Sequence, residues 1–194
     1  MGQVIVDISP SIDGYVAGRN ISVDKPFGDA GHRLHRWIGY ESAIPTPADQ
    51  EAGARMFANA GAVVLGRRMF DVGIGTWGDD GAFGMPSFVV TSRPRQDLVK
   101  GPTTFRFVTD GVAQAMCLAQ EAAGNRNVVV VGGADVVRQC LAAGHVHTLH
   151  LHLVPVILGA GTPLFSGETP RYDLETTSVT TTPHATHLTY TVKR

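Results

Sequence analysis

Residues 127–144 read NVVVVGGADVVRQCLAAG and decide the class of fold. Four consecutive valines, bounded by Gly132 and Gly133, are typical of a strand that is buried on both faces. The apolar residues that follow recur at helical spacing as far as Gly144, a residue type that commonly ends helices. A strand that runs through a glycine turn into a helix is the building unit of a parallel α/β sheet.

The same alternation extends in both directions from this segment. A helical pattern covers 30–39, and further helical patterns begin after Thr46-Pro47, at residue 66 and after Asp110. The last thirty residues predict an antiparallel hairpin, formed by 176–182 and 187–193. We therefore expect one α/β domain over 1–194, with a mixed, mostly parallel sheet, helices on both faces and a C-terminal hairpin. Further strand patterns cover 3–10, 61–66, 87–92, 105–109 and 148–158.

Composition excludes several classes of function. The formal charge of the 194 residues is −1, so no overall field favours nucleic acid or an anionic membrane. No apolar run approaches the roughly 20 residues of a membrane helix, and no signal-peptide pattern opens the sequence. Cys117 and Cys140 lie in helical patterns and form neither a disulfide framework nor a metal spacing. We expect a cytoplasmic protein without a metal site.

Three polar or glycine-rich segments follow strands, where ligands of α/β sheets bind. Gly66-Arg67-Arg68 offers guanidinium groups and helix N–H groups that suit a phosphate. Gly132-Gly133-Ala134 lets backbone N–H groups approach a pyrophosphate. Ser92-Arg93-Pro94 is a polar strand end that suits an adenosine. Each also has an ordinary interpretation, as a tight turn or a solvated surface, and together they favour a dinucleotide without the Rossmann or P-loop fingerprint.

In this order the motifs resemble the dihydrofolate-reductase-like superfamily, and more closely the reductase domain of bacterial riboflavin biosynthesis, in particular its stand-alone deaminase–reductase C-terminal members. The resemblance covers almost the whole chain and rests on 4–17, 64–70 and 129–165. It implies the same fold, an NADPH-dependent oxidoreductase and, as in many relatives, a homodimer. A zinc-deaminase half is absent from the sequence, since no His/Cys cluster of that kind occurs.

The resemblance also implies the residues of a cofactor site. Those beside the nicotinamide and in the loop over it are Ser9, Val16, Ala17 and Gly18. Those at the adenosine end are Gly66, Arg67, Arg68, Met69, Ser92 and Arg93. Those around the pyrophosphate are Gly132, Gly133, Ala134, Asp135, Val136 and, from the opposite side, Thr162. Two arginines where a 2′-phosphate would lie favour NADPH over NADH.

A candidate catalytic pair lies on two strands. Asp7 interrupts an apolar run, where an unpaired carboxylate is costly, and His150 and His152 share one face of their strand. The resemblance places these strands side by side, with Asp7 and His152 facing the substrate cavity. We hypothesise that they form a hydrogen-bonded pair that orients or protonates the substrate, with Trp37, His150 and Phe165 lining the cavity. The alternative is a purely structural pair, with the aromatic residues as plain core.

The sequence departs from true dihydrofolate reductases at their proton-donating carboxylate, which lies on the first long helix. The predicted helix at 30–39 carries no acid on its apolar face before Glu41. We therefore expect hydride transfer to a small C=N or C=O substrate, such as a pterin or pyrimidinone, other than dihydrofolate. Two alternatives are a non-catalytic binder of a nucleotide or pterin, and a weak dihydrofolate reductase with a water or His35 as proton source.

Overall fold

The computed structural model of the protein describes residues 2–166 and 171–193. The helices of this part are α1 (Pro47–Met56), α2 (Arg67–Gly73), α3 (Gly111–Ala123), α4 (Ala134–Ala142) and the 3₁₀ helices η1 (Gly31–Ile38) and η2 (Tyr40–Ser42). The strands are β1 (Val4–Ile8), β2 (Tyr15–Ala17), β3 (Ala60–Gly66), β4 (Pro86–Val90), β5 (Leu98–Lys100), β6 (Thr103–Val108), β7 (Asn127–Gly132), β8 (Thr148–Leu153), β9 (Thr162–Pro163), β10 (Leu174–Thr181) and β11 (Thr186–Val192).

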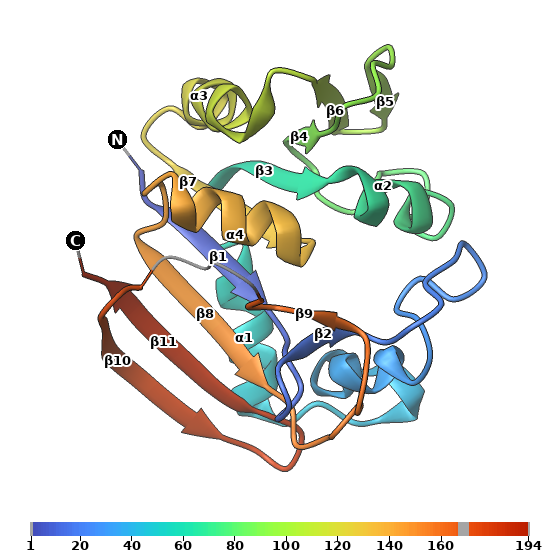
Figure 1. Ribbon diagram of the computed structural model, residues 1–194, viewed down its shortest axis with the longest axis vertical. Coiled ribbons are helices and arrows are strands. Elements are labelled where there is room, and N and C mark those ends of the chain that lie inside the picture. Colours follow the sequence, from blue (N-terminus) through green and yellow to red (C-terminus); the bar gives the residue numbers. More distant parts are fainter. Residues whose placement is uncertain (1, 167–170, 194) are drawn as a thin grey trace.

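Within the described residues, nine strands form one sheet in the order β10-β11-β8-β1-β7-β3-β4-β6-β5 (Figure 1). The five central pairings, from β8–β1 to β4–β6, are parallel. The pairings β10–β11, β11–β8 and β5–β6 are antiparallel. The predicted mixed, mostly parallel sheet with a C-terminal hairpin is therefore confirmed.

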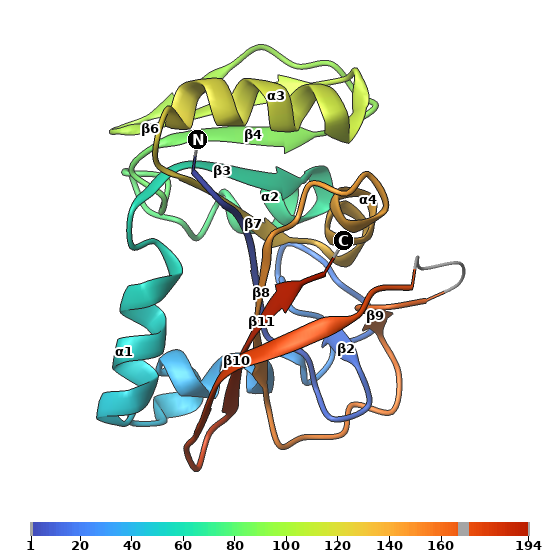
Figure 2. The same cartoon turned by 90° about the vertical axis from the view of Figure 1, so that its left-hand side faces the viewer.

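Helices cover both faces of this sheet, because alternate strand residues carry apolar side chains to each side. Val4 and Val6 of β1 pack with α3 and α4 in one core cluster. Val63 and Leu65 of β3 pack on the other side, against Phe70 of α2. Figure 2 places α1 on the side of the sheet away from α4. We call the side that α1 and α2 cover the α1/α2 face.

Some predicted elements differ in kind or length from the structure. The segment predicted as a helix at 30–39 is the 3₁₀ helix η1, so the first α-helix is α1. The strand predicted over 148–158 ends at Leu153, two residues before Pro155, which lacks an N–H for the ladder. The short strands β2, β5 and β9 were not predicted. Among the residues described, no helix has the length and apolar character that crossing a membrane requires.

Candidate active site

A cluster of buried polar side chains lies on the α1/α2 face, where β1 and β8 run side by side. The Asp7 and His150 positions pair directly across these parallel strands, and His152 lies two residues further on the same face. Asp7 Oδ1 is 3.0 Å from His152 Nε2, and Asp7 Oδ2 is 3.2 Å from His150 Nδ1. The contact predicted between Asp7 and His152 is therefore present, and His150 adds a second.

Asp7 is an ionised carboxylate in this setting. Its side chain is only 2% exposed. Burial raises the pKa of Asp7, but the hydrogen bonds from His150 and His152 and the electrostatic attraction of these rings outweigh the effect of burial, so the pKa lies below its ordinary value. A carboxylate that accepts hydrogen bonds from two imidazoles fixes the orientation of both rings.

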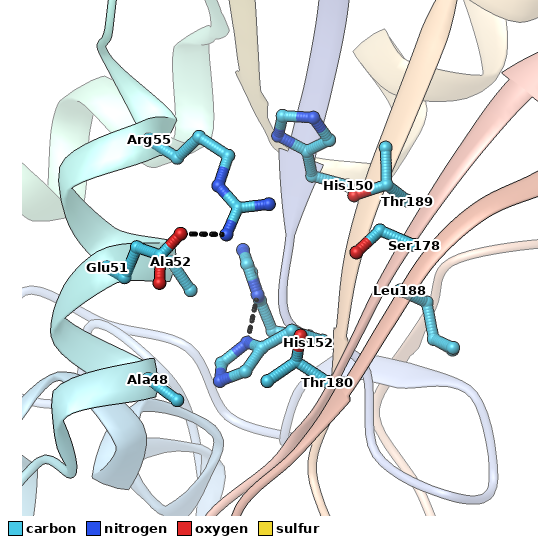
Figure 3. Close-up of a pocket in the computed structure, with 11 residues that line it drawn as sticks. Ala48, Glu51, Ala52, Arg55, His150, His152, Ser178, Thr180, Leu188 and Thr189 are labelled. Carbon is cyan, nitrogen blue, oxygen red and sulfur yellow. Dashed lines mark hydrogen bonds and ion pairs between the residues drawn. The ribbon is translucent and has the colours of Figure 1, made fainter.

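The cluster continues beyond His152 to residues that the sequence did not single out. His152 Nδ1 is 2.7 Å from His187 Nδ1 on β11, and His187 Nε2 is 2.9 Å from Asp49 Oδ1 on α1. Asp7, His152, His187 and Asp49 thus form one chain of hydrogen bonds across three strands and a helix, which we call the His–Asp chain. Figure 3 shows His152 with the dashed contact to its imidazole neighbour.

Asp49 owes its position to the start of α1. Thr46 caps this helix: the Asp49 N–H donates to Thr46 Oγ1 at 3.2 Å, and the Thr46 N–H donates back to Asp49 Oδ2 at 2.8 Å. The Thr182 hydroxyl donates to Asp49 Oδ1 at 2.8 Å, and the Asp49 side chain is 0% exposed. Burial raises the pKa of Asp49, but the hydrogen bonds from Thr46 and His187 outweigh this effect, so the pKa lies below its ordinary value.

Trp37 covers the His–Asp chain from the side of η1. Its ring lies against the His152 imidazole, with 4.1 Å between centroids, and its Nε1–H donates to Ser9 Oγ at 3.0 Å. Trp37 is 1% exposed. Phe165 is 47% exposed, and no ring contact among residues 2–166 and 171–193 joins it to His152. Of these two predicted substrate residues, the structure brings only Trp37 to the pair.

A small, partly open cavity lies between α1 and strands β8, β10 and β11 (Figure 3). His150, with 12% of its side chain exposed, is the member of the β1–β8 cluster most open to it. Other side chains at the cavity are Glu51, Arg55, His152, Ser178, Thr180 and His187.

The predicted adenosine end gathers arginines at the ends of β3 and β4. Arg67 Nε donates to Asp71 Oδ1 at 2.7 Å, and Arg93 donates to Asp71 Oδ2 at 2.9 Å from the loop after β4. Arg95, which the sequence did not single out, lies over the Phe70 and Phe107 rings. Arg68 follows Arg67 in α2 and is exposed. We call the four arginines, Arg67, Arg68, Arg93 and Arg95, the arginine cluster; Asp71 is the carboxylate that pairs with Arg67 and Arg93.

The glycine segment at the end of β7 meets the end of β3. A Cβ added to Gly66 would lie 3.4 Å from the Gly133 nitrogen and 3.1 Å from Val136 Cγ2. A Cβ at Gly133 would meet nothing within 4 Å, so the backbone at the start of α4 is open on that side. Gly133 precedes Ala134, the first residue of α4, and makes no side-chain cap. The first N–H groups of a helix have no partner within the helix, so those of α4 can bind an anion.

The remaining predicted cofactor residues lie on both sides of this junction. Met69 Sδ is 3.7 Å from where a Gly132 Cβ would be. Asp135 bonds within α4, with its Oδ2 accepting from Gln139 Nε2 at 2.7 Å. Ala17 of β2 pairs with Thr162 of β9 in a two-stranded sheet.

The loop predicted to cover the nicotinamide is held by close backbone approaches. A Cβ on Gly18 would lie 1.9 Å from the Asp29 carbonyl oxygen, and one on Gly161 would lie 2.0 Å from the Ala17 oxygen. Val16 packs on the α3/α4 core, and Ser92 follows β4 beside Arg93. Only glycine permits these two approaches, so the loop is held against the backbone of Asp29 and of Gly161, the residue before β9.

Comparison with known proteins adds the family. The sequence profile of the RibD C-terminal domain matches residues 3–188. The chain belongs to this family. No curated protein sequence matches it. RibD C-terminal domains are reductase domains, and membership supports an oxidoreductase of the riboflavin-pathway or dihydrofolate-reductase type.

Solved structures agree with the fold of a RibD C-terminal domain. A putative riboflavin biosynthesis protein from Shewanella sp. PV-4 is 20% identical, with a TM-score of 0.72 and 99% of each chain covered. Dihydrofolate reductase from Enterococcus faecalis, complexed with NADP(H), is 15% identical, with a TM-score of 0.64 over 100% of this chain and 98% of that chain. A deaminase/reductase from Thermotoga maritima is 11% identical, with a TM-score of 0.63 over 99% of this chain and 57% of that chain.

One interpretation of the sequence needs correction in this RibD C-terminal domain. The first α-helix does carry a buried acid, because that helix is α1 and its third residue is Asp49. The Thr46-Pro47 start predicts Thr46 as the cap of this helix, and Thr46 is the cap, but the start does not predict that the acid at the third position is buried. The hairpin β10–β11 covers Asp49 with Thr182 and His187, and that contact is invisible before the chain is folded.

Proposed function

We propose that this chain is an NADPH-dependent reductase of a small substrate with a C=N or C=O bond, such as a pterin or pyrimidinone. The observation that carries the proposal is the continuity of the arginine cluster with the Gly66–Gly133 junction and the open start of α4. A guanidinium group suits a 2′-phosphate, and the bare backbone at the junction suits a pyrophosphate. A cofactor bound there supplies a hydride from its nicotinamide ring.

The His–Asp chain supports the second half of the proposal. Reduction of a C=N or C=O bond needs a proton as well as a hydride, and Asp7 and His152 are the catalytic pair that we assign to this step. His150 reaches the cavity and is placed to contact the substrate. Asp49 does not favour a dihydrofolate reductase, because Thr46, Thr182 and His187 already occupy both of its oxygens. Burial lowers the pKa of His35 to about 4, so His35 is no proton source at neutral pH.

Ligand-dependent thermal unfolding tests the cofactor assignment. A ligand at about 100 times its dissociation constant stabilises the folded state by about 2.7 kcal/mol. We expect NADPH and NADP⁺ to raise the melting temperature clearly, and NADH to raise it much less. Equal shifts from NADPH and NADH would remove the 2′-phosphate from the proposal, and no shift from any nicotinamide cofactor would overturn it.

Arg68→Ala identifies the responsible surface. Loss of one charge-assisted hydrogen bond costs about 1.5–3 kcal/mol, so the variant should bind NADPH at least about tenfold more weakly and bind NADH unchanged. Arg106→Ala is the matched control, since Arg106 is exposed on β6 beside the two phenylalanines that pack toward α2. An equal loss in both variants would indicate a general effect of charge.

Turnover assays separate the reductase from its alternatives. NADPH oxidation with a pterin, pyrimidinone or carbonyl compound supports the proposal, and oxidation only with dihydrofolate would favour a weak dihydrofolate reductase. Binding without any oxidation would favour a nucleotide-binding protein. We also propose a homodimer, which sedimentation of the chain at several concentrations tests directly.

A further inference from the structure

The His–Asp chain contains more hydrogen bonds than two neutral imidazoles can make. Asp7 and Asp49 are both ionised acceptors, so His152 Nε2 and His187 Nε2 must each carry a proton. The two Nδ1 atoms lie 2.7 Å apart, and a hydrogen bond between them needs one further proton. Three protons on two rings make one neutral imidazole and one imidazolium.

We propose that His152 is this imidazolium: it donates to Asp7 through Nε2 and to neutral His187 through Nδ1, and it holds the proton that the reduction consumes. Asp49 and His187 are then positioning residues. Asp49 holds the His187 proton on Nε2, which leaves His187 Nδ1 as the acceptor that His152 requires. This assignment rests on the proposed function only for the use of the proton.

Two further observations place the charge on His152 and not on His187. The face of Trp37 lies 4.1 Å from the His152 ring, where an aromatic ring stabilises a cation, whereas its contact with His187 is edge-on at 5.2 Å. Burial lowers the pKa of His187, and the hydrogen bond to Asp49 offsets this only in part. A neutral His187 that accepts from a charged His152 satisfies both conditions.

The charged groups around the pair are consistent with one stored proton. Asp7 on β1 and Asp49 on α1 face it from opposite ends, and His150 bonds to the far oxygen of Asp7. Arg55 and Glu51 lie across the cavity, paired at 3.1 Å. From η1, His35 lies near His152, and its lowered pKa leaves it uncharged. Two carboxylates therefore flank one imidazolium, and Arg55 and Glu51 offset each other.

The proposed step balances in protons and electrons. The substrate carbon would gain the hydride from a reduced nicotinamide, which would be oxidised, and the substrate nitrogen or oxygen would gain a proton that leaves His152 by way of Asp7. His152 loses one proton in net terms and becomes neutral, so the C=N or C=O bond becomes CH–NH or CH–OH. Solvent that enters the cavity beside His150 and His152 restores the proton.

Nitrogen NMR of the ¹⁵N-histidine-labelled protein, without cofactor or substrate, measures the proton count directly. We expect one histidine, His152, to be protonated on both nitrogens at neutral pH, and a second, His187, to be protonated on Nε2 alone. His187→Phe removes the acceptor and should leave His152 neutral. His187→Asn keeps an oxygen near the Nδ1 position and should preserve the imidazolium. A neutral His152 in the wild type would overturn the proposal.

Asp49→Asn tests the His–Asp chain at the residue that contacts His187 and does not contact His152. The side-chain amide introduced by this substitution can donate to His187 Nε2, which moves the His187 proton to Nδ1. The Nδ1–H groups of His187 and His152 then face each other, and two donors cannot form a hydrogen bond. We expect His152 to lose its Nδ1 proton in this variant. Asp79→Asn is the control for the loss of a carboxylate, because Asp79 is exposed in a loop and is no member of the His–Asp chain. An unchanged His152 in Asp49→Asn would overturn the positioning role.

The outcome is independent of whether the protein is a reductase. If NADPH fails to bind but the NMR result holds, the proposed function fails and the stored proton stands. If a substrate is turned over, Asp49→Asn should lower kcat while the KM for NADPH hardly changes. An unchanged kcat in Asp49→Asn would contradict the assignment.

Discussion

Asp7→Asn tests how much the buried carboxylate contributes to the fold and to turnover. Asp7 accepts one hydrogen bond at 3.0 Å from His152 and one at 3.2 Å from His150. Asparagine keeps one acceptor and loses the charge. Hydrogen bonds to charged groups contribute about 1.5–3 kcal/mol, so we expect the variant to lose about that much free energy of unfolding at neutral pH. For a chain of this size that corresponds to about 3–12 °C in melting temperature.

The loss should depend on pH with a definite sign. Because the pKa of Asp7 is lowered by folding, its stabilising effect is complete above the unfolded value of about 4 and disappears as the pH falls through the lower folded value. The difference between wild type and variant should therefore be largest near neutral pH and shrink in acid.

Urea unfolding followed by circular dichroism measures this difference. Asp79→Asn, in an exposed loop, is the control and should behave as wild type. NADPH affinity should hardly change in Asp7→Asn, while turnover should be lost. A variant as stable as wild type at every pH would refute the ionised, doubly bonded carboxylate. A variant that does not fold at all would favour a structural role for the pair.

Two further predictions concern packing and thiol reactivity. Gly53→Ala within α1 should stabilise the protein by roughly 0.4–1 kcal/mol, because the new Cβ would lie at an ordinary contact distance of 3.8 Å from Trp37. Gly61→Ala should destabilise the protein by about 1–3 kcal/mol, because its Cβ would lie 2.7 Å from Ala123 Cα. Thermal unfolding of both variants checks the opposite signs. Cys117 should react with a thiol reagent in the native protein, since its side chain is exposed. Cys140 should not react, because burial raises its pKa to about 12. Two fast-reacting thiols would contradict this prediction.

The fold was predictable where the apolar pattern is strong. The valine run of β7 and the helical spacing of α4 gave both elements and the turn between them. The strands β2, β5 and β9 have three residues or fewer, which is too short for a period of two to stand out. Leu34 and Trp37 of η1 are buried in a core cluster, and their spacing does not distinguish a 3₁₀ helix from an α-helix.

The candidate site was predictable only in part. Asp7 attracts notice because a carboxylate inside an apolar strand needs a partner, and the period of two placed His150 and His152 on one face. Asp49 and His187 gave no such signal, since one has the position of an ordinary helix cap and the other lies in a threonine-rich hairpin. Their contact spans 138 residues, and no local pattern encodes it. The roles of the four residues of the His–Asp chain, and of His150, stay predictions.

The order of strands has a consequence for synthesis on the ribosome. β1 emerges first, yet its neighbours in the sheet are β7 and β8, and the far end of the His–Asp chain closes only with β11. During translation Asp7 therefore lacks its imidazole partners until β8 has left the exit tunnel, and Asp49 lacks its partner until residue 187 has left it. The nascent protein can form its β3–β4–β6 half early, but the polar cluster is complete only after β11 has emerged.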